Sequence, residues 1–207
     1  MLSFNKVYKG DYKIVNENIT DLSKAFFHGV AGLEVNFVMY PEDGLYLSMV
    51  KLNSILQHKG IYSREKMKGL NIYYPPEFGY HINSADVNMI NNYVSICKRI
   101  GQVEDTAFEE FIEGKISIAL RPDIAERLNF RNKINYSPDP GEEQVLDGIG
   151  IDEFIAIVID IKSERYRTLA IEKVTELLRR HNLNKLPITD INGNQLSVPI
   201  HEIDDER

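Results

Sequence analysis

The sequence predicts an α+β domain, because strand-like and helix-like segments are mixed along the chain without a regular alternation of the two. Apolar runs bounded by turn residues indicate strands, and apolar residues at helical spacing indicate helices. The chain has 207 residues, of which 43% are hydrophobic and 27% are charged, as is usual for a soluble globular protein. We expect residues 1–207 to form one domain.

The first segments are mostly extended. Residues 21–29, DLSKAFFHG, carry a short apolar run that ends in His28-Gly29. Residues 33–40, LEVNFVMY, alternate like a half-buried strand, and PEDG at 41–44 indicates a turn. A helix is expected over 45–60, because its apolar residues recur near helical spacing and Gly60 suits a helix end.

The middle of the chain combines a loop with further helices. Residues 73–76, YYPP, indicate a loop. A helix is expected over 83–99 with Ser84 as its N-cap, and a short one over 106–112. KISIAL at 115–120 indicates a strand.

The last part begins with a short helix over 123–130, because Pro122 suits a first helical turn. Strands are expected at 143–146 and 154–161, the second apolar enough to be central. A helix over 167–181 follows, and the tail LPITDINGNQLSVPI predicts a hairpin around Asn192-Gly193.

Charge and cysteine content limit the function classes. The formal net charge of −7 disfavours a large non-specific contact with phosphate backbones, although a local basic group is present at Lys115, Arg121, Arg127, Arg131 and Lys133. Cys97 is the only cysteine, which favours a reducing compartment. The N-terminus does not resemble a signal peptide, and no run reaches the roughly 18 apolar residues of a membrane span. We therefore expect a cytoplasmic protein, in its own cell or in a target cell.

Three segments and one strand contain the residues that indicate a possible chemical function. The first segment is His28-Gly29-Val30, at the end of an apolar run. The second is KLNSIL at 51–56, followed by Gly60-Ile61-Tyr62-Ser63-Arg64. The third is EQVL at 143–146, followed by Ile149, Ile151 and Ile155. The strand ISIALRP lies between the last two and includes Ser117.

In their order and spacing, these segments resemble the ADP-ribosyltransferase superfamily, on its diphtheria-toxin, PARP and DarT side. The resemblance covers about residues 26–160 and implies a split mixed β-sheet core with flanking helices. It implies that NAD is the substrate, without a metal. Val30 departs from the pattern, which usually has a threonine after His-Gly.

The resemblance implies that Glu143 is the catalytic carboxylate. Cleavage of the bond between nicotinamide and ribose develops positive charge in the sugar, and a carboxylate beside the ribose 2′-hydroxyl stabilises that charge. Glu142 precedes it and would point to the opposite face of a strand, although a bulge would exchange the two. A solvent-facing strand residue is the structural alternative for Glu143.

The same resemblance implies the NAD-binding residues. Gly29 would hold the nicotinamide amide through its backbone N–H and C=O, His28 would bond the ribose hydroxyls, and Tyr62 would stack on the nicotinamide ring. Ser117 would line the nicotinamide pocket. A core histidine, a half-buried tyrosine and a surface arginine are the structural alternatives for His28, Tyr62 and Arg64. The residues placed to meet the diphosphate are Ser63 and Arg64.

The acceptor and the activity stay open. The loop 131–141 touches the acceptor in this superfamily, so the candidates for acceptor selection are Arg131, Asn132, Asn135 and Tyr136. A protein and a nucleic-acid base are both compatible, as is a partner chain that silences the activity. An NAD glycohydrolase and a non-enzymatic interaction module, for example from a phage or toxin system, remain alternatives. The scattered histidines show no metal-ligand spacing.

Overall fold

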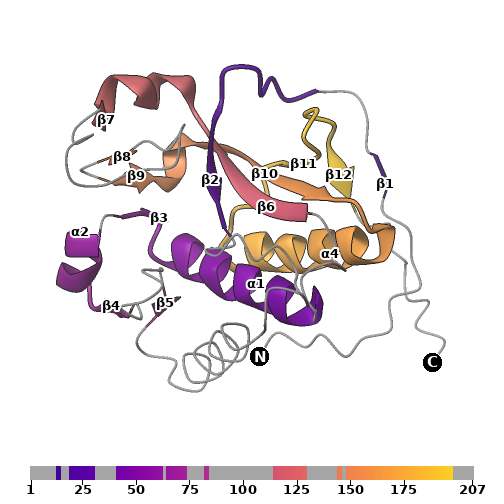
Figure 1. The fold of residues 1–207 in the computed structure, drawn as a ribbon, viewed down its shortest axis with the longest axis horizontal. Coiled ribbons are helices and arrows are strands. Elements are labelled where there is room, and N and C mark those ends of the chain that lie inside the picture. The colour runs from indigo at the N-terminus through magenta and orange to yellow at the C-terminus, as the bar shows by residue number, and fades with distance from the viewer. Residues whose placement is uncertain are drawn as a thin grey trace, which may run out of the picture.

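The computed structural model of this chain describes residues 13–14, 19–30, 41–62, 64–73, 82–83, 114–129, 144–145 and 148–197 (Figure 1). These residues form a mixed α+β structure, as the sequence predicts. A four-stranded sheet with the order β11-β10-β6-β2 lies at its centre. The expected segments 33–40, 84–99, 106–112 and 131–141 lie outside the described residues.

The sheet is built on two long, apolar strands. β6 (Gly114–Leu120) and β10 (Phe154–Ile161) pair antiparallel, with Ile118 opposite Ile157. β2 (Phe26–Gly29) pairs antiparallel with the other edge of β6, and β11 (Ile188–Thr189) pairs parallel with β10. The predicted strands 115–120 and 154–161 are therefore confirmed, and the second is central, as expected from its branched apolar residues.

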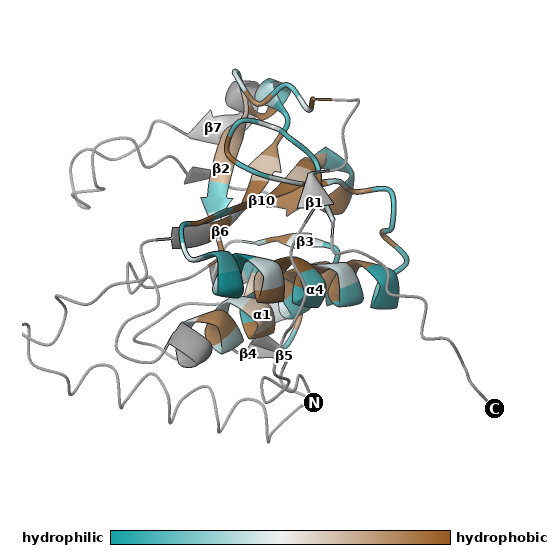
Figure 2. Cartoon of the chain, turned by 90° about the vertical axis from the view of Figure 1, so that its right-hand side faces the viewer, coloured by the Kyte–Doolittle hydropathy of each residue, from teal (hydrophilic) through white to brown (hydrophobic). Residues whose placement is uncertain are grey.

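Two helices cover one face of the sheet (Figures 1 and 2). They are α1 (Pro41–Gln57) and α4 (Glu164–Arg180). Isoleucines at every second position of β6 and β10 face these helices. With the apolar side chains of α1 and α4 they form one hydrophobic core, whose strand residues include Ile116, Ile118, Ile157, Ile159 and Ile161. A hydrogen bond of 3.0 Å between His181 and Asn53 Oδ1 joins the end of α4 to α1.

The opposite face of the sheet carries a second, smaller core. It consists of Leu22, Ala119, Ala156 and Val158, with Ala25 and Ile155 against it. Since strand side chains alternate between faces, this set interleaves with the isoleucines that face the helices. Phe27 also belongs to this face, and 46% of its surface is exposed.

Short paired strands surround the sheet. They are β1 (Lys13–Ile14) with β12 (Leu196–Ser197), β3 (Gly60–Ile61) with β9 (Ile149–Gly150), β4 (Ile72–Tyr73) with β5 (Ile82–Asn83), and β7 (Leu128–Asn129) with β8 (Gln144–Val145). α2 (Arg64–Gly69) connects β3 to β4. Two 3₁₀ helices complete the set, Pro122–Arg127 and Ile151–Glu153.

The first helix differs from the prediction at both ends. The PEDG segment, expected as a turn, forms the start of α1, which begins at Pro41. Proline suits a first helical turn as well as it suits a β-turn, so the residue type alone does not separate the two. The helix ends at Gln57 rather than at Gly60. Lys59 takes the left-handed backbone conformation, with φ of 57°, and Gly60 already belongs to β3.

Other boundaries also differ. Ile82 and Asn83 form a strand where the start of a helix was expected, and Tyr73 lies in β4 rather than in a loop. The helix expected over 123–130 is a 3₁₀ helix that ends at Arg127. α4 begins three residues before the predicted start, after Ser163 at its N-cap position.

The tail turns at Asn192-Gly193, as predicted, and the Asp190 carboxylate accepts hydrogen bonds from the backbone N–H groups of Asn192 and Asn194. Its two arms pair antiparallel through a bridge between Thr189 and Gln195, as a hairpin requires, while β11 also joins β10 and β12 joins β1. Among the described residues, no helix is both long and apolar enough to cross a membrane.

Candidate functional site

The end of β2 exposes a backbone donor and a backbone acceptor. The N–H of Val30 donates to the carbonyl of Ile116 at 2.9 Å, and Gly29 is opposite Ser117. Because antiparallel pairs alternate between bonded and non-bonded, the N–H and C=O of Gly29 point away from β6. β2 is the last strand on this side of the described sheet, so both groups face its free edge, and Gly29 itself is exposed.

A buried lysine reaches this edge from α1. Lys51 Nζ donates a hydrogen bond of 3.1 Å to the carbonyl oxygen of Gly29. The lysine is 5% exposed, and its burial lowers the pKa of the ammonium group to about 7. The contact links the His28-Gly29 segment to the predicted KLNSIL helix. Lys51 is not among the site residues predicted from the sequence, although its position between the apolar, buried residues Val50 and Leu52 could have indicated it.

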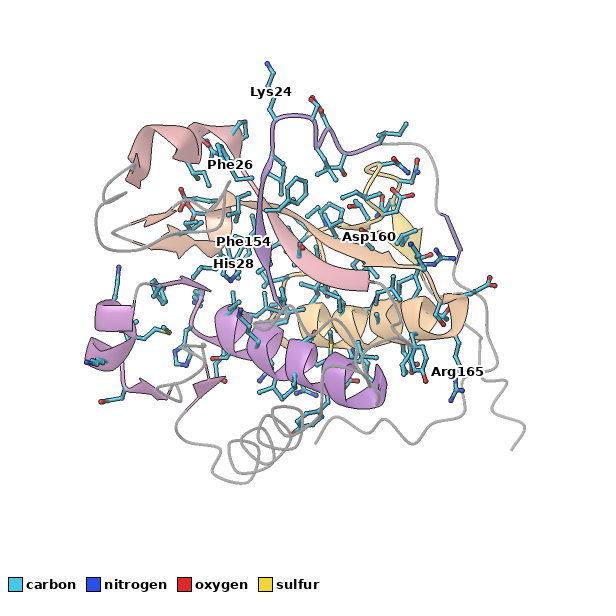
Figure 3. All side chains as sticks on the ribbon, in the orientation of Figure 1. Lys24, Phe26, His28, Phe154, Asp160 and Arg165 are labelled. Atoms are coloured by element: carbon cyan, nitrogen blue, oxygen red, sulfur yellow. The ribbon has the colours of Figure 1, made fainter. Side chains whose placement is uncertain are left out.

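His28 and Ser117 lie on opposite faces of the sheet. His28 is opposite Ile118, which faces the helices, and Figure 3 shows His28 near the end of β2 that approaches α1. Ser117 is opposite Gly29 and Val158, on the face away from the helices, and it is 3% exposed. The two side chains therefore do not converge. Ser117 is adjacent to Gly29, which has no side chain on that face to separate it from a ligand at the edge.

The ring of Tyr62 packs closely against the backbone at two glycines, Gly60 and Gly148. Its hydroxyl donates to the carbonyl of His58 at 2.9 Å, and Lys66 Nζ lies 5.0 Å from its ring centroid. A methyl group at Gly148 would lie 2.7 Å from the ring, and one at Gly60 would lie 3.0 Å from it. Gly148 also has φ of 81°, which glycine adopts without strain. The half-buried ring thus packs closely on both segments.

The pairing of β3 with β9 brings the second motif segment to the residues that follow the third, whereas Gln144 and Val145 of the third pair with β7. Gly60 is opposite Gly150, and Ile61 is opposite Ile149. Gly148 precedes β9 and follows Glu143 by five positions in the sequence. Glu143 lies outside the described residues, as do the predicted Ser63, Arg131, Asn132, Asn135 and Tyr136. Arg64 begins α2, where the structure describes its backbone alone.

A line of buried polar side chains follows Lys51 along α1. The hydroxyl oxygen of Ser54 and Nε2 of His58 are buried, and neither has a hydrogen-bond partner within the part of the chain that the structure describes. Partial burial lowers the pKa of His58. Helical spacing puts Lys51, Ser54 and His58 on one side of α1. This side is therefore polar, although α1 is otherwise an apolar core helix.

Neither of the two described hollows is lined by Gly29, Lys51 or Tyr62. One of about 180 Å³ lies between the end of β10, Arg167 and the turn at Asp190–Asn192. Another, of about 390 Å³, is open and is lined by residues 19–23, Phe27, Ile191 and Asn192. No group of acidic, histidine or cysteine side chains suited to a metal occurs among the described residues. The candidate site therefore has two parts, the Gly29 edge with Lys51 and the segment around Tyr62.

Comparison of this chain with protein-family models, with curated proteins and with solved structures found no match.

Proposed function

We propose that this protein is an NAD-dependent mono-ADP-ribosyltransferase that transfers ADP-ribose to a protein or nucleic-acid acceptor. The proposal rests on two contacts between the motif-bearing parts of the chain. Lys51 joins α1 to Gly29, and β3 pairs with β9 directly before Tyr62 and directly after Gly148. The first segment thus contacts the helix of the second, and the residues before Tyr62 pair with the strand that follows the third; these contacts support the proposal.

The proposed roles follow from this arrangement. The free-edge N–H and C=O of Gly29 would receive the amide of nicotinamide, and His28 would approach the ribose from the helix side. Tyr62 would supply an aromatic surface, and its hydrogen bond to His58 fixes the ring. Ser117 would contact the ligand from the outer face. Ser63 and Arg64 would meet the diphosphate.

Glu143 would stabilise the positive charge that develops on the ribose as the glycosidic bond breaks. The electron pair of that bond leaves with the pyridine nitrogen, and the acceptor atom that bonds to the ribose loses a proton. The loop 131–141, with Arg131, Asn132, Asn135 and Tyr136, would select the acceptor. The assignment of Glu143 rests on the EQVL motif, because this residue lies outside the described part of the chain.

The test uses the purified full chain, labelled NAD and a cell lysate, with nicotinamide release and label transfer measured together. We expect both signals. Glu143→Gln should reduce nicotinamide release by about 100-fold or more, because the carboxylate charge acts chiefly in the transition state. Glu142→Gln removes the same charge one position away and should cost far less. Wild-type rates in Glu143→Gln would refute the assignment, and a larger loss in Glu142→Gln would exchange the two roles.

The same assay separates the alternatives. Release without transfer to any acceptor would indicate an NAD glycohydrolase. Absence of release from folded protein would favour a non-enzymatic interaction module. One observation favours such a module: Ile19, Phe27 and Ile191 are 67%, 46% and 47% exposed, and all three line the open hollow on the outer side of the sheet. Apolar side chains gathered in this way are typical of protein contacts.

A further inference from the structure

The face of the sheet away from the helices carries an open hollow of about 390 Å³, which we call the outer hollow. It is lined by residues 19–23, Phe27, Ile191 and Asn192. Ile19, Phe27 and Ile191 are large hydrophobic residues that are exposed, whereas Leu22 is buried and belongs to the smaller core of this face. The outer hollow thus has an apolar lining that continues from that core to the surface.

Of the described helices, neither α1 nor α4 covers this face. Both lie on the other side of the sheet, where isoleucines of β6 and β10 contact them (Figure 2). On the outer side the same two strands carry Ala119 and Ala156, which form one cluster with Leu22. Exposed apolar side chains that gather in one place on a protein surface indicate a site for a binding partner.

The walls of the outer hollow are fixed by local hydrogen bonds. The backbone N–H of Thr20 donates to the carbonyl of Gly193 at 3.0 Å, which joins residues 19–23 to the turn of the tail. A methyl group at Gly193 would collide with the Thr20 carbonyl, so the two backbones approach as closely as glycine allows. Asp21 Oδ1 accepts hydrogen bonds from the N–H and the hydroxyl of Ser23, at 3.0 Å and 2.6 Å. A partner therefore meets a surface that is already ordered, which lowers the entropic cost of binding.

The rim of the outer hollow is polar and carries one negative charge. Thr20, Ser23 and Asn192 supply polar groups, and Asp21 is the only charged residue among the described residues that line it. The hydrogen bonds from Ser23 lower the pKa of Asp21, so its carboxylate is ionised at neutral pH. Lys24 does not line the outer hollow, and Figure 3 shows its side chain directed away from the sheet. An apolar centre inside a polar rim is the usual composition of a protein–protein interface.

We propose that the outer hollow binds a basic segment of a partner protein, with an apolar side chain against Phe27 and a lysine or arginine beside Asp21. The formal net charge of −7 attracts such a segment over a distance. The same charge disfavours a nucleic acid, and it disfavours a second copy of this chain, which is equally negative. Docking at this face needs neither NAD nor Glu143, so it is independent of the proposed transferase activity.

The experiment begins with a library of short random peptides displayed on phage. Peptides are selected on the immobilised full chain, with soluble Phe27→Ala protein present to remove those that bind elsewhere. We expect the selected peptides to carry an apolar residue next to a lysine or arginine. The affinity of the consensus peptide, measured by fluorescence polarisation, should fall about tenfold or more in Phe27→Ala, because a central aromatic residue contributes strongly to an interface. Asp21→Asn should weaken binding about threefold, as expected for an exposed ion pair.

The matched control is Leu70→Ala. Leu70 is 46% exposed, as Phe27 is, but it does not line the outer hollow. This variant should keep the wild-type affinity, and thermal melting of all three variants verifies that they are folded. Selection of no peptide that depends on Phe27, selection of acidic peptides, or an equal loss in Leu70→Ala would overturn the inference. So would self-association of the wild type that Phe27→Ala abolishes in sedimentation, because the occupant would then be a second copy. None of these results affects the assay of NAD cleavage.

Discussion

Replacement of Lys51 by methionine should stabilise the folded protein near neutral pH. Burial moves the pKa of this lysine from 10.5 to about 7, which corresponds to roughly 5 kcal/mol for holding the charged form inside the folded chain. The hydrogen bond to Gly29 offsets part of this cost, by about 1.5–3 kcal/mol. Methionine fills a similar volume without a charge. We therefore expect Lys51→Met to raise the free energy of unfolding by about 2 kcal/mol at pH 7.

The pH dependence identifies the cause. A group whose pKa is lower in the folded state binds fewer protons there, so stability rises with pH between the folded and the unfolded values. For Lys51 this range runs from about 7 to 10.5. Urea unfolding of wild type and Lys51→Met at pH 6, 7, 8, 9 and 10 should give a difference that is largest at pH 6. The advantage of the variant should shrink steadily above pH 7.

Two features make this measurement decisive. His58 and His181, whose pKa values are lowered by burial, titrate in both proteins, so their effect cancels in the difference. Lys173→Met controls for the loss of a buried lysine side chain that does not contact Gly29. A stability difference that stays constant from pH 6 to pH 10, or a variant that is less stable than wild type at pH 6, would refute the reasoning.

Two further substitutions test how the site is held. Gly148→Ala places a methyl group 2.7 Å from the Tyr62 ring and the Ile61 carbonyl at a backbone φ of 81°, so it should lower stability by about 1–3 kcal/mol. Gly69→Ala, whose added methyl group meets no atom within 4 Å, should leave the thermal melting temperature unchanged or raise it; equal melting temperatures for the two variants would contradict this account of Tyr62. Asn53→Ala removes the 3.0 Å hydrogen bond to His181 that joins α1 to α4, and it should cost about 1 kcal/mol in urea unfolding. Unchanged unfolding of Asn53→Ala would mean that apolar packing alone holds the two helices together.

Most of the central fold could be predicted from the sequence because its signals are long and consistent. β10 is almost wholly branched and apolar, and α4 has a helical apolar pattern with Arg179 and Arg180 at its end. The errors fall where one residue type serves two structures. Pro41 and Gly44 are compatible with a turn and with a helix start. Lys59 takes the left-handed conformation that glycine usually adopts after a helix. The prediction assigned the helix end to Gly60, the next residue, which belongs to β3.

The site was less predictable, because its geometry depends on pairing between distant strands. His28 and Ser117 can be selected as polar residues on strands, but only the register of β2 on β6 places them on opposite faces. The partner of Lys51 is a backbone carbonyl 22 residues earlier, and a carbonyl has no signature in the sequence. Tyr62 was selected by resemblance, whereas its support from Gly60 and Gly148 arises from the pairing of β3 with β9.

The position of Lys51 separates a structural from a functional account of α1. A helix that only completes the core is better served by an apolar residue at this position, because a buried ammonium group lowers stability throughout the neutral range. Its hydrogen bond also occupies an acceptor at an exposed sheet edge, where water would satisfy the Gly29 carbonyl at no cost. A ligand that meets the ammonium group at Gly29 would account for both facts, since functional sites are where proteins gain from a buried charge.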